Sequence, residues 1–213
     1  MSQQCLEFVT VDVFTRQTFG GNPLAVFFAA EQLSDKQMQQ IAREMNYSET
    51  TFVLPPVDTA NTASVRIFTP TNELPFAGHP NVGTGYVLAN HPSAVPTTGT
   101  VTTSTNPETG QGQASMCFEE KAGLVQVLVD MSSDDKAQQA RIAAPQALRQ
   151  RPGHSIEAMA RALNLEPDQI LGAAEGSTIV SVGIEFPVVE VGDLHALRQS
   201  SANVEQFKRL SLN

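Results

Sequence analysis

The sequence predicts an α+β fold in which a strongly curved sheet or barrel wraps around one apolar helix. Strand-like and helix-like segments are mixed along the 213 residues without a regular β-α-β alternation. The segment from Pro80 to about Asn90 has the length of a helix and carries no charged residue. A helix without a polar face is buried on all sides. We expect Gly83 and Gly85 to let the surrounding strands approach it closely.

The N-terminal elements can be read in order. Two strands are expected over Leu6–Phe14 and Leu24–Ala29, and the TFGGNP turn between them indicates a hairpin. An amphipathic helix is expected from about Asp35 to Met45, because Ser34 and the glutamine three residues later form a capping box. Further strands are expected at YSETTFVL and over 63–70.

The remaining chain returns to strands and finishes in helices. The expected elements are strands at VTTST, QASMCFE and GLVQVLVDM, a helix at SIEAMARALN opened by Ser155, a helix at EPDQILG between Pro167 and Gly172, two strands within Ser177–Val191 on either side of Gly183, and helical segments at GDLHALRQ and ANVEQFKRL.

Charge and composition exclude some classes of partner. The formal net charge of -9 argues against nucleic acid or an anionic membrane surface, because both select basic patches. No apolar run approaches the roughly 20 residues that span a bilayer, and the N-terminus lacks a basic segment followed by an apolar one. A cytoplasmic protein that binds small molecules or other proteins is expected.

Metal and nucleotide sites find no support in the residue spacing. Cys5 and Cys117 form no C-x-x-C pair and are most simply reduced thiols in strands, with a redox or catalytic role as the alternative. Neither a G-x-G-x-x-G nor a P-loop signature is present. The four histidines show no metal-ligand spacing and have no acidic cluster beside them, so we expect no metal: His79, His91, His154 and His195.

The start of the apolar helix is the first candidate site. Its first N–H groups have no intrahelical partner and lie at the positive end of the helix dipole. Gly78 would let a carboxylate approach the backbone, and His79 could donate a hydrogen bond or relay a proton there. The alternative is a capped, buried helix whose histidine only makes local hydrogen bonds.

Glu49 is the second candidate. It begins the strand ETTFVL, in which both alternating sets of side chains are partly apolar, so the strand is expected to be covered on both faces. A carboxylate that begins such a strand would be partly desolvated, as suits a general base. The alternative is a solvated residue at a strand end.

The N-terminal motifs together resemble the PhzF-like phenazine biosynthesis family, relatives of diaminopimelate epimerase. The resemblance rests on VDVFT, GGNPLAVF, MQQIAREMNYSETTFVLPP and VRIFTPTNELPFAGHPNVGTG, in that order, and continues more weakly through GLVQVLVDM and SVGIEFPVVEV. It implies two similar domains, each a curved sheet around a central helix, with the active site between them.

The resemblance also implies roles for the candidate residues. The glutamate of the family's N-x-S-E-T motif falls on Glu49, and its substrate-contacting Gly-His pair falls on Gly78 and His79. Glu49 would then move a proton between carbons of a small carboxylate-bearing substrate, as an isomerase without cofactor or metal. Epimerases of the superfamily use two cysteines, and none stands near Gly78, so thiol chemistry is disfavoured.

One part of the family pattern is missing. The second copy of the glycine-rich turn and central helix does not follow Val191. We therefore expect an N-terminal domain over 1–115 and a partial second domain over 116–213 that lacks its helix. The inner faces of GLVQVLVDM and IVSVGIEFPVVEV would then form an apolar patch, which a second copy of the chain would cover in a dimer. The alternative function is a truncated, non-catalytic protein that binds a small acid or a protein partner.

Overall fold

The computed structural model describes residues 5–106, 108, 110–172 and 176–211 and divides the chain into two compact units, Met1–Gln146 and Ala147–Asn213. The division falls later than the boundary expected after residue 115. The reason is that the strands from 102 to 143 pair with the N-terminal strands and complete their sheet.

Unit 1 contains a nine-stranded sheet with the order β1-β2-β3-β4-β7-β8-β9, to which β5 and β6 add beside β4 and β7. β1 and β2 form the expected antiparallel hairpin, and β3 adds parallel to β2. The strands are β1 (Phe8–Val13), β2 (Asn22–Phe27), β3 (Glu49–Leu54), β4 (Ala63–Phe68), β5 (Glu73–Leu74), β6 (Thr102–Thr105), β7 (Gly112–Glu120), β8 (Gly123–Met131) and β9 (Ala137–Ala143).

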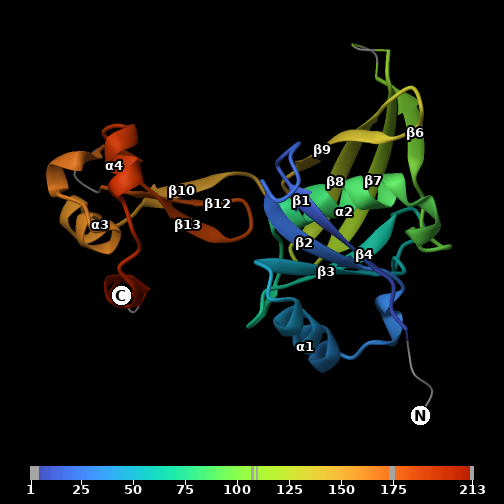
Figure 1. The fold of residues 1–213 in the computed structure, drawn as a ribbon, viewed down its shortest axis with the longest axis horizontal. Coiled ribbons are helices and arrows are strands. Elements are labelled where there is room, and N and C mark those ends of the chain that lie inside the picture. Colours follow the sequence, from blue (N-terminus) through green and yellow to red (C-terminus); the bar gives the residue numbers. More distant parts are fainter. Residues whose placement is uncertain (1–4, 107, 109, 173–175, 212–213) are drawn as a thin grey trace. The chain divides into compact units, whose positions relative to one another are not determined.

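Helix α1 (Asp35–Met45) connects the parallel strands β2 and β3 and covers the outer face of the sheet (Figure 1). Its bounds and its capping box, made by Ser34 and Gln37, are as predicted. Met38 and Ala42 on this helix pack against Phe52 and its neighbours in one buried apolar cluster. This cluster covers one of the two faces of β3.

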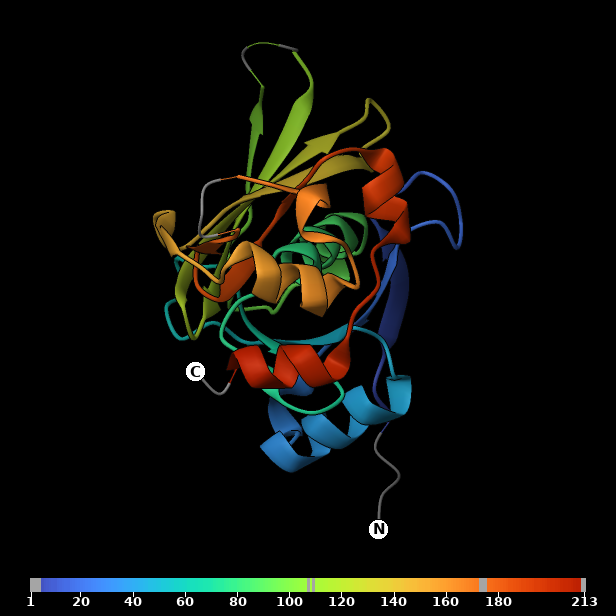
Figure 2. The same cartoon turned by 90° about the vertical axis from the view of Figure 1, so that its left-hand side faces the viewer.

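Helix α2 (Gly78–Asn90) lies inside the curve of the sheet, and Figure 2 looks approximately along it with strands on several sides. The glycine prediction is confirmed: a Cβ at Gly83 would come within 2.5 Å of Leu24, and one at Gly85 within 2.4 Å of Val127. Close packing against β2 and β8 therefore requires glycine at both positions. The helix begins two residues before Pro80, with Ala77 as its N-cap residue.

Helix α2 is not buried on every side. Val82 and Tyr86, one helical turn apart, are only half-buried and line a groove between β1 and β9, the two edge strands of the main strand order. The sheet thus encloses the helix incompletely.

Strand β8 corrects one expectation. Its residues Val125, Val127 and Val129 were expected to add to an exposed apolar patch, but all three are fully buried. The reason is that β8 belongs to the sheet of unit 1 and packs against α2.

Unit 2 contains small sheets and short helices. The two strands expected around Gly183 are present as β12 and β13, whereas EPDQILG forms a single 3-10 turn followed by a strand. Its elements are β10 (Arg149–Pro152), α3 (Ile156–Leu163), η3 (Pro167–Gln169), β11 (Ile170–Leu171), β12 (Thr178–Ser181), β13 (Glu185–Val188), β14 (Glu190–Val191), α4 (Leu194–Gln199) and α5 (Val204–Ser211). The short 3-10 helices η1 (Ala30–Gln32) and η2 (Pro92–Ala94) belong to unit 1.

Candidate functional site

The fold brings Glu49 and His79 together. Glu49 is the first residue of β3, whose next four residues are buried, so the prediction of a strand covered on both faces is confirmed. Alternation places Glu49 on the same face as Thr51, which shares a 2.9 Å hydrogen bond with Thr84 of α2. Glu49 therefore projects on the α2 side of the sheet.

The side chains of Glu49 and His79 are in direct contact. Glu49 Oε2 lies 3.2 Å from Nδ1 of His79, and the two side chains are only 18% and 8% exposed. The contact does not have hydrogen-bond geometry, and the buried Nε2 of His79 has no hydrogen-bond partner in the part of the chain that the structure describes. Glu49 is therefore partly desolvated, and the alternative of a solvated residue at a strand end does not describe it.

Burial sets the protonation of His79. Desolvation lowers the pKa of His79, while the nearby Glu49 carboxylate and the backbone of Pro23 act in the opposite direction. With its pKa below the ordinary value of 6.5, His79 is mainly neutral at pH 7. A neutral imidazole offers one N–H donor and one acceptor nitrogen.

The beginning of α2 is open beside these side chains. Among the described residues, a Cβ at Gly78 would meet no atom within 4 Å, and no side chain caps the N-terminus of the helix. The first backbone N–H groups are therefore available, apart from the one that Pro80 lacks. This turn has the features that favour an anion at a helix N-terminus.

Two polar contacts position Glu49, and sequence reasoning missed both. Ser48 donates a 2.8 Å hydrogen bond to Asn22 Oδ1, which joins the start of β3 to the start of β2. The Thr51–Thr84 hydrogen bond joins β3 to α2. Asn22 and Ser48 belong to the conspicuous GGNP and NYSET segments, so their position in sequence was a usable signal.

A second carboxyl group lies near the same end of α2. Glu120 ends β7, and burial raises its pKa to about 8, against a smaller opposite effect of a hydrogen bond with Asn81. Asn81 is fully buried and donates a 2.9 Å hydrogen bond to the carbonyl of Ala77. Sequence reasoning missed Glu120, although it continues the alternating buried row of β7.

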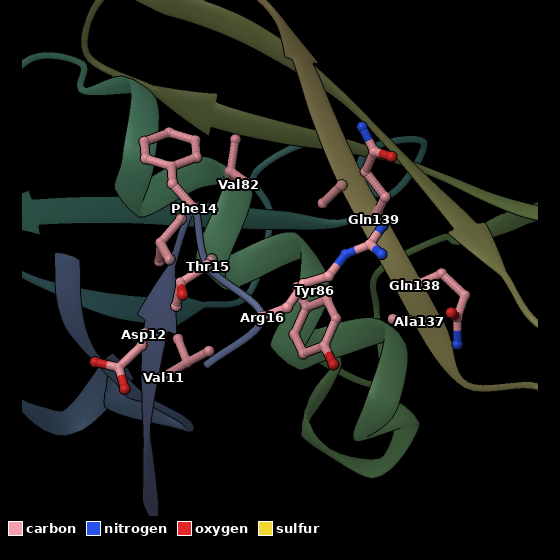
Figure 3. A pocket seen from close by; sticks show the side chains of 13 residues that line it. Val11, Asp12, Phe14, Thr15, Arg16, Val82, Tyr86, Ala137, Gln138 and Gln139 are labelled. Carbon is pink, nitrogen blue, oxygen red and sulfur yellow. The ribbon is translucent and has the colours of Figure 1, made fainter. Parts of the chain in front are cut away.

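A cavity of about 850 Å³ lies along the half-buried stripe of α2, and Figure 3 shows the side chains around it. Arg16 extends into it from the connection after β1, toward the side on which Gln139 of β9 lies. Glu49, Gly78 and His79 are not among its lining residues. The cavity is therefore separate from the carboxylate and imidazole described above.

The remaining titratable side chains do not form a metal site in the described part of the chain. Within residues 5–106, 108, 110–172 and 176–211, no three His, Cys, Asp or Glu side chains are grouped as metal ligands. Cys117 lies in β7 as expected, whereas Cys5 is exposed ahead of β1. Over the same described residues, no helix is long and apolar enough to cross a bilayer.

Comparison with known proteins places these residues in a family context. The family model described as "Phenazine biosynthesis-like protein" matches residues 11–211. An uncharacterised isomerase of Mesorhizobium japonicum is 34% identical over 196 residues, which is 91% of this chain and 58% of the relative. An uncharacterised isomerase of Escherichia coli is 32% identical over 91% of this chain and 62% of the relative.

A second group of relatives matches a shorter segment at higher identity. The trans-2,3-dihydro-3-hydroxyanthranilate isomerase of Pseudomonas chlororaphis is 57% identical over 84 residues, covering 39% of this chain and 30% of that protein. Among solved structures, a PhzF family protein of Bacillus anthracis matches with a TM-score of 0.72 at 24% identity, over 96% of this chain and 62% of that one. This chain therefore spans about 60% or less of the length of these relatives.

Proposed function

Because the chain belongs to the phenazine biosynthesis-like protein family, we propose that it carries the N-terminal half of a cofactor-independent isomerase site. Glu49 is the general acid and base, and the start of α2 at Gly78 and His79 binds the substrate. The observation that carries the proposal is the buried contact of 3.2 Å between Glu49 and His79 beside an open helix N-terminus.

The proposed reaction is a proton transfer within one substrate. Glu49 takes a proton from one carbon, the electron pair of that C–H bond delocalises into the adjacent double bonds, and Glu49 returns the proton to another carbon. The product has the same atoms and the same oxidation state as the substrate. A positioned carboxylate of this kind contributes about 10²- to 10⁴-fold to the rate.

The first residues of α2 supply the binding half of the site. A substrate carboxylate at Gly78 would meet backbone N–H groups and the positive end of the helix dipole. Neutral His79 would present a ring nitrogen without adding a second titrating charge. Keeping the carboxylate at this position would hold the reacting carbons near Glu49.

The substrate class is taken from the relatives. Several of them are named as isomerases of trans-2,3-dihydro-3-hydroxyanthranilate, an amino- and hydroxy-substituted cyclohexadiene carboxylic acid. We propose a small unsaturated carboxylic acid of this kind as the substrate. Its fully aromatic counterpart, 3-hydroxyanthranilate, cannot isomerise in the same way and is a stable probe for binding.

The test combines exchange and binding. The full chain is incubated in deuterated water with trans-2,3-dihydro-3-hydroxyanthranilate, and deuterium incorporation is followed by mass spectrometry. We expect Glu49→Gln to reduce incorporation at least about 100-fold while 3-hydroxyanthranilate still binds. Glu31→Gln, an exposed carboxylate on η1, is the matched control and should leave both unchanged.

Two results would contradict parts of the proposal. Equal incorporation by the Glu49→Gln variant and the natural chain would remove Glu49 from the reaction. Binding of 3-hydroxyanthranilate without exchange in the natural chain would instead support the alternative, a non-catalytic protein that binds a small acid.

A further inference from the structure

Glu120 ends a row of side chains that point toward the central helix. Ala114, Met116 and Phe118 alternate along β7 and are all buried, and Glu120 occupies the next position of the same row. Both of its carboxyl oxygens are inaccessible to solvent and lack a hydrogen-bond partner of good geometry among the residues that the structure describes. A carboxyl group in such a place requires either a partner or a proton.

Asn81 carries a buried hydrogen-bond acceptor that needs a donor. Its Nδ2 donates to the carbonyl of Ala77, the N-cap residue of α2, but its buried Oδ1 accepts no hydrogen bond from the described part of the chain. The Asn81 and Glu120 side chains are in contact. A protonated Glu120 has one O–H to donate, and Asn81 Oδ1 is an acceptor without a donor.

The neighbouring backbone links Glu120 to the same turn. Just beyond β7, the N–H of Ala122 donates a 3.0 Å hydrogen bond to the carbonyl of Pro75. The β7–β8 connection is thereby tied to the segment that leads into α2. Glu120 and the Ala77–Gly78 turn are therefore held together through both side chain and backbone.

We propose that Glu120 is a positioning residue that acts in its protonated form. It donates a hydrogen bond to Asn81 Oδ1, and Asn81 in turn holds the carbonyl of Ala77, so that the turn at Gly78 keeps its geometry and its positive potential. Loss of the proton would place a negative charge behind a site for an anion and weaken carboxylate binding. This inference rests on the proposed function, in which Gly78 binds the substrate carboxylate.

Burial raises the pKa of Glu120 to about 8 and so places the change above neutral pH, while the hydrogen bond with Asn81 acts weakly in the opposite direction. Neighbouring charged groups are engaged elsewhere. Arg66 and Lys121 pair with Glu73, and Glu119 accepts from the backbone N–H groups of Val57 and Asp58. Glu49 lies against His79. Burial lowers the pKa of His79, which moves its titration away from that of Glu120.

The first measurement needs no variant. In the full chain labelled with ¹³C, the carboxyl carbon of Glu120 and the carbonyl carbon of Ala77 are followed by NMR from about pH 6 to about pH 10. We expect both to titrate together with a midpoint near 8. In Glu120→Gln, whose amide can still donate to Asn81, the Ala77 carbonyl should not titrate in this range.

The second measurement concerns binding. The dissociation constant of 3-hydroxyanthranilate should rise about tenfold between about pH 7 and about pH 9 in the natural chain, because two carboxylates repel each other in a partly buried site. It should stay constant in Glu120→Gln. The control Glu31→Gln should behave like the natural chain.

The outcomes separate this inference from the proposed function. If Ala77 does not sense the titration of Glu120, or if the variant keeps the full pH dependence of binding, the role of Glu120 is overturned. If Ala77 titrates as expected but the probe binds at no pH, the coupling is supported and the carboxylate site at Gly78 fails. An ordinary pKa for the Glu120 carboxyl would also overturn the inference, and the titration of the natural chain is sufficient to show it.

Discussion

The two units differ in how far the apolar side chains of their strands are buried. In unit 1, Val125, Val127 and Val129 of β8 face the enclosed helix α2 and are fully buried. In unit 2, Phe186 and Val188 of β13 are 59% and 52% exposed. Both strands are rich in residues that favour sheets.

The difference shows what α2 does for the first sheet. A strand has two faces, and its apolar residues become buried only where another layer covers them. Helix α2 provides that layer in unit 1, and its glycines allow the strands to come close. The same helix presents its N-terminus to Glu49, so the element that completes the core also builds the candidate site.

The largest effect is expected from removing an aromatic side chain in unit 1. Phe52 is fully buried between Phe27 and Phe68, and we expect Phe52→Ala to lower the free energy of unfolding of unit 1 by about 3–5 kcal/mol. The matched variant Phe186→Ala removes an exposed ring from unit 2 and should change stability by no more than about 0.5 kcal/mol.

Urea unfolding followed by methyl NMR separates the two units, with Val127 reporting unit 1 and Ile179 reporting unit 2. A loss of several kcal/mol in Phe186→Ala would mean that β13 is covered in solution. It would thereby contradict the difference between the units.

Much of this fold was predictable because local patterns and tertiary packing agree. Helix α1 was predicted to the residue, since a capping box marks its start, and the β1–β2 hairpin followed from a glycine turn between two apolar runs. Two of the missed strands are polar: β9 reads AQQARIA and β10 reads RQRP. Their strand conformation comes from pairing with β8 and β12, which no local pattern records.

The site was predictable in part. The types and positions of Glu49, Gly78 and His79 suggested carboxylate chemistry, but only the curvature of the sheet decides that β3 and α2 bring them within contact. The domain boundary was displaced for a similar reason, because β7 pairs in parallel with β4 across a long separation in sequence. Glu120 was missed because its importance depends on burial against Asn81.

A smaller effect is expected from the proton on Glu120, and it sharpens the comparison because it belongs to unit 1. The pKa of Glu120 rises from an ordinary value of 4.5 to about 8 on folding. Between these values the native state holds a proton that the unfolded chain has lost. The stability of unit 1 should therefore decrease as the pH rises through this window.

Glu120→Gln removes this contribution, since its amide does not ionise. We expect the variant to gain about 2–3 kcal/mol relative to the natural chain between about pH 5 and about pH 8, after allowance for solvent around a half-buried group. The gain is measured from the urea midpoints of the Val127 methyl signal in both proteins at both pH values. An unchanged difference between variant and natural chain would show that Glu120 ionises in the folded protein as it does in the unfolded chain.

The smallest effect is expected from removing the serine that caps one helix in each unit. Ser34 caps α1 in unit 1 and Ser155 caps α3 in unit 2, and each accepts a hydrogen bond from a backbone N–H in the first turn. Replacing either serine by alanine should cost about 1 kcal/mol. If the units unfold separately, Ser34→Ala lowers the urea midpoint of Val127 alone and Ser155→Ala that of Ile179 alone. Equal shifts of both signals in either variant would instead show that the two units unfold as one cooperative body.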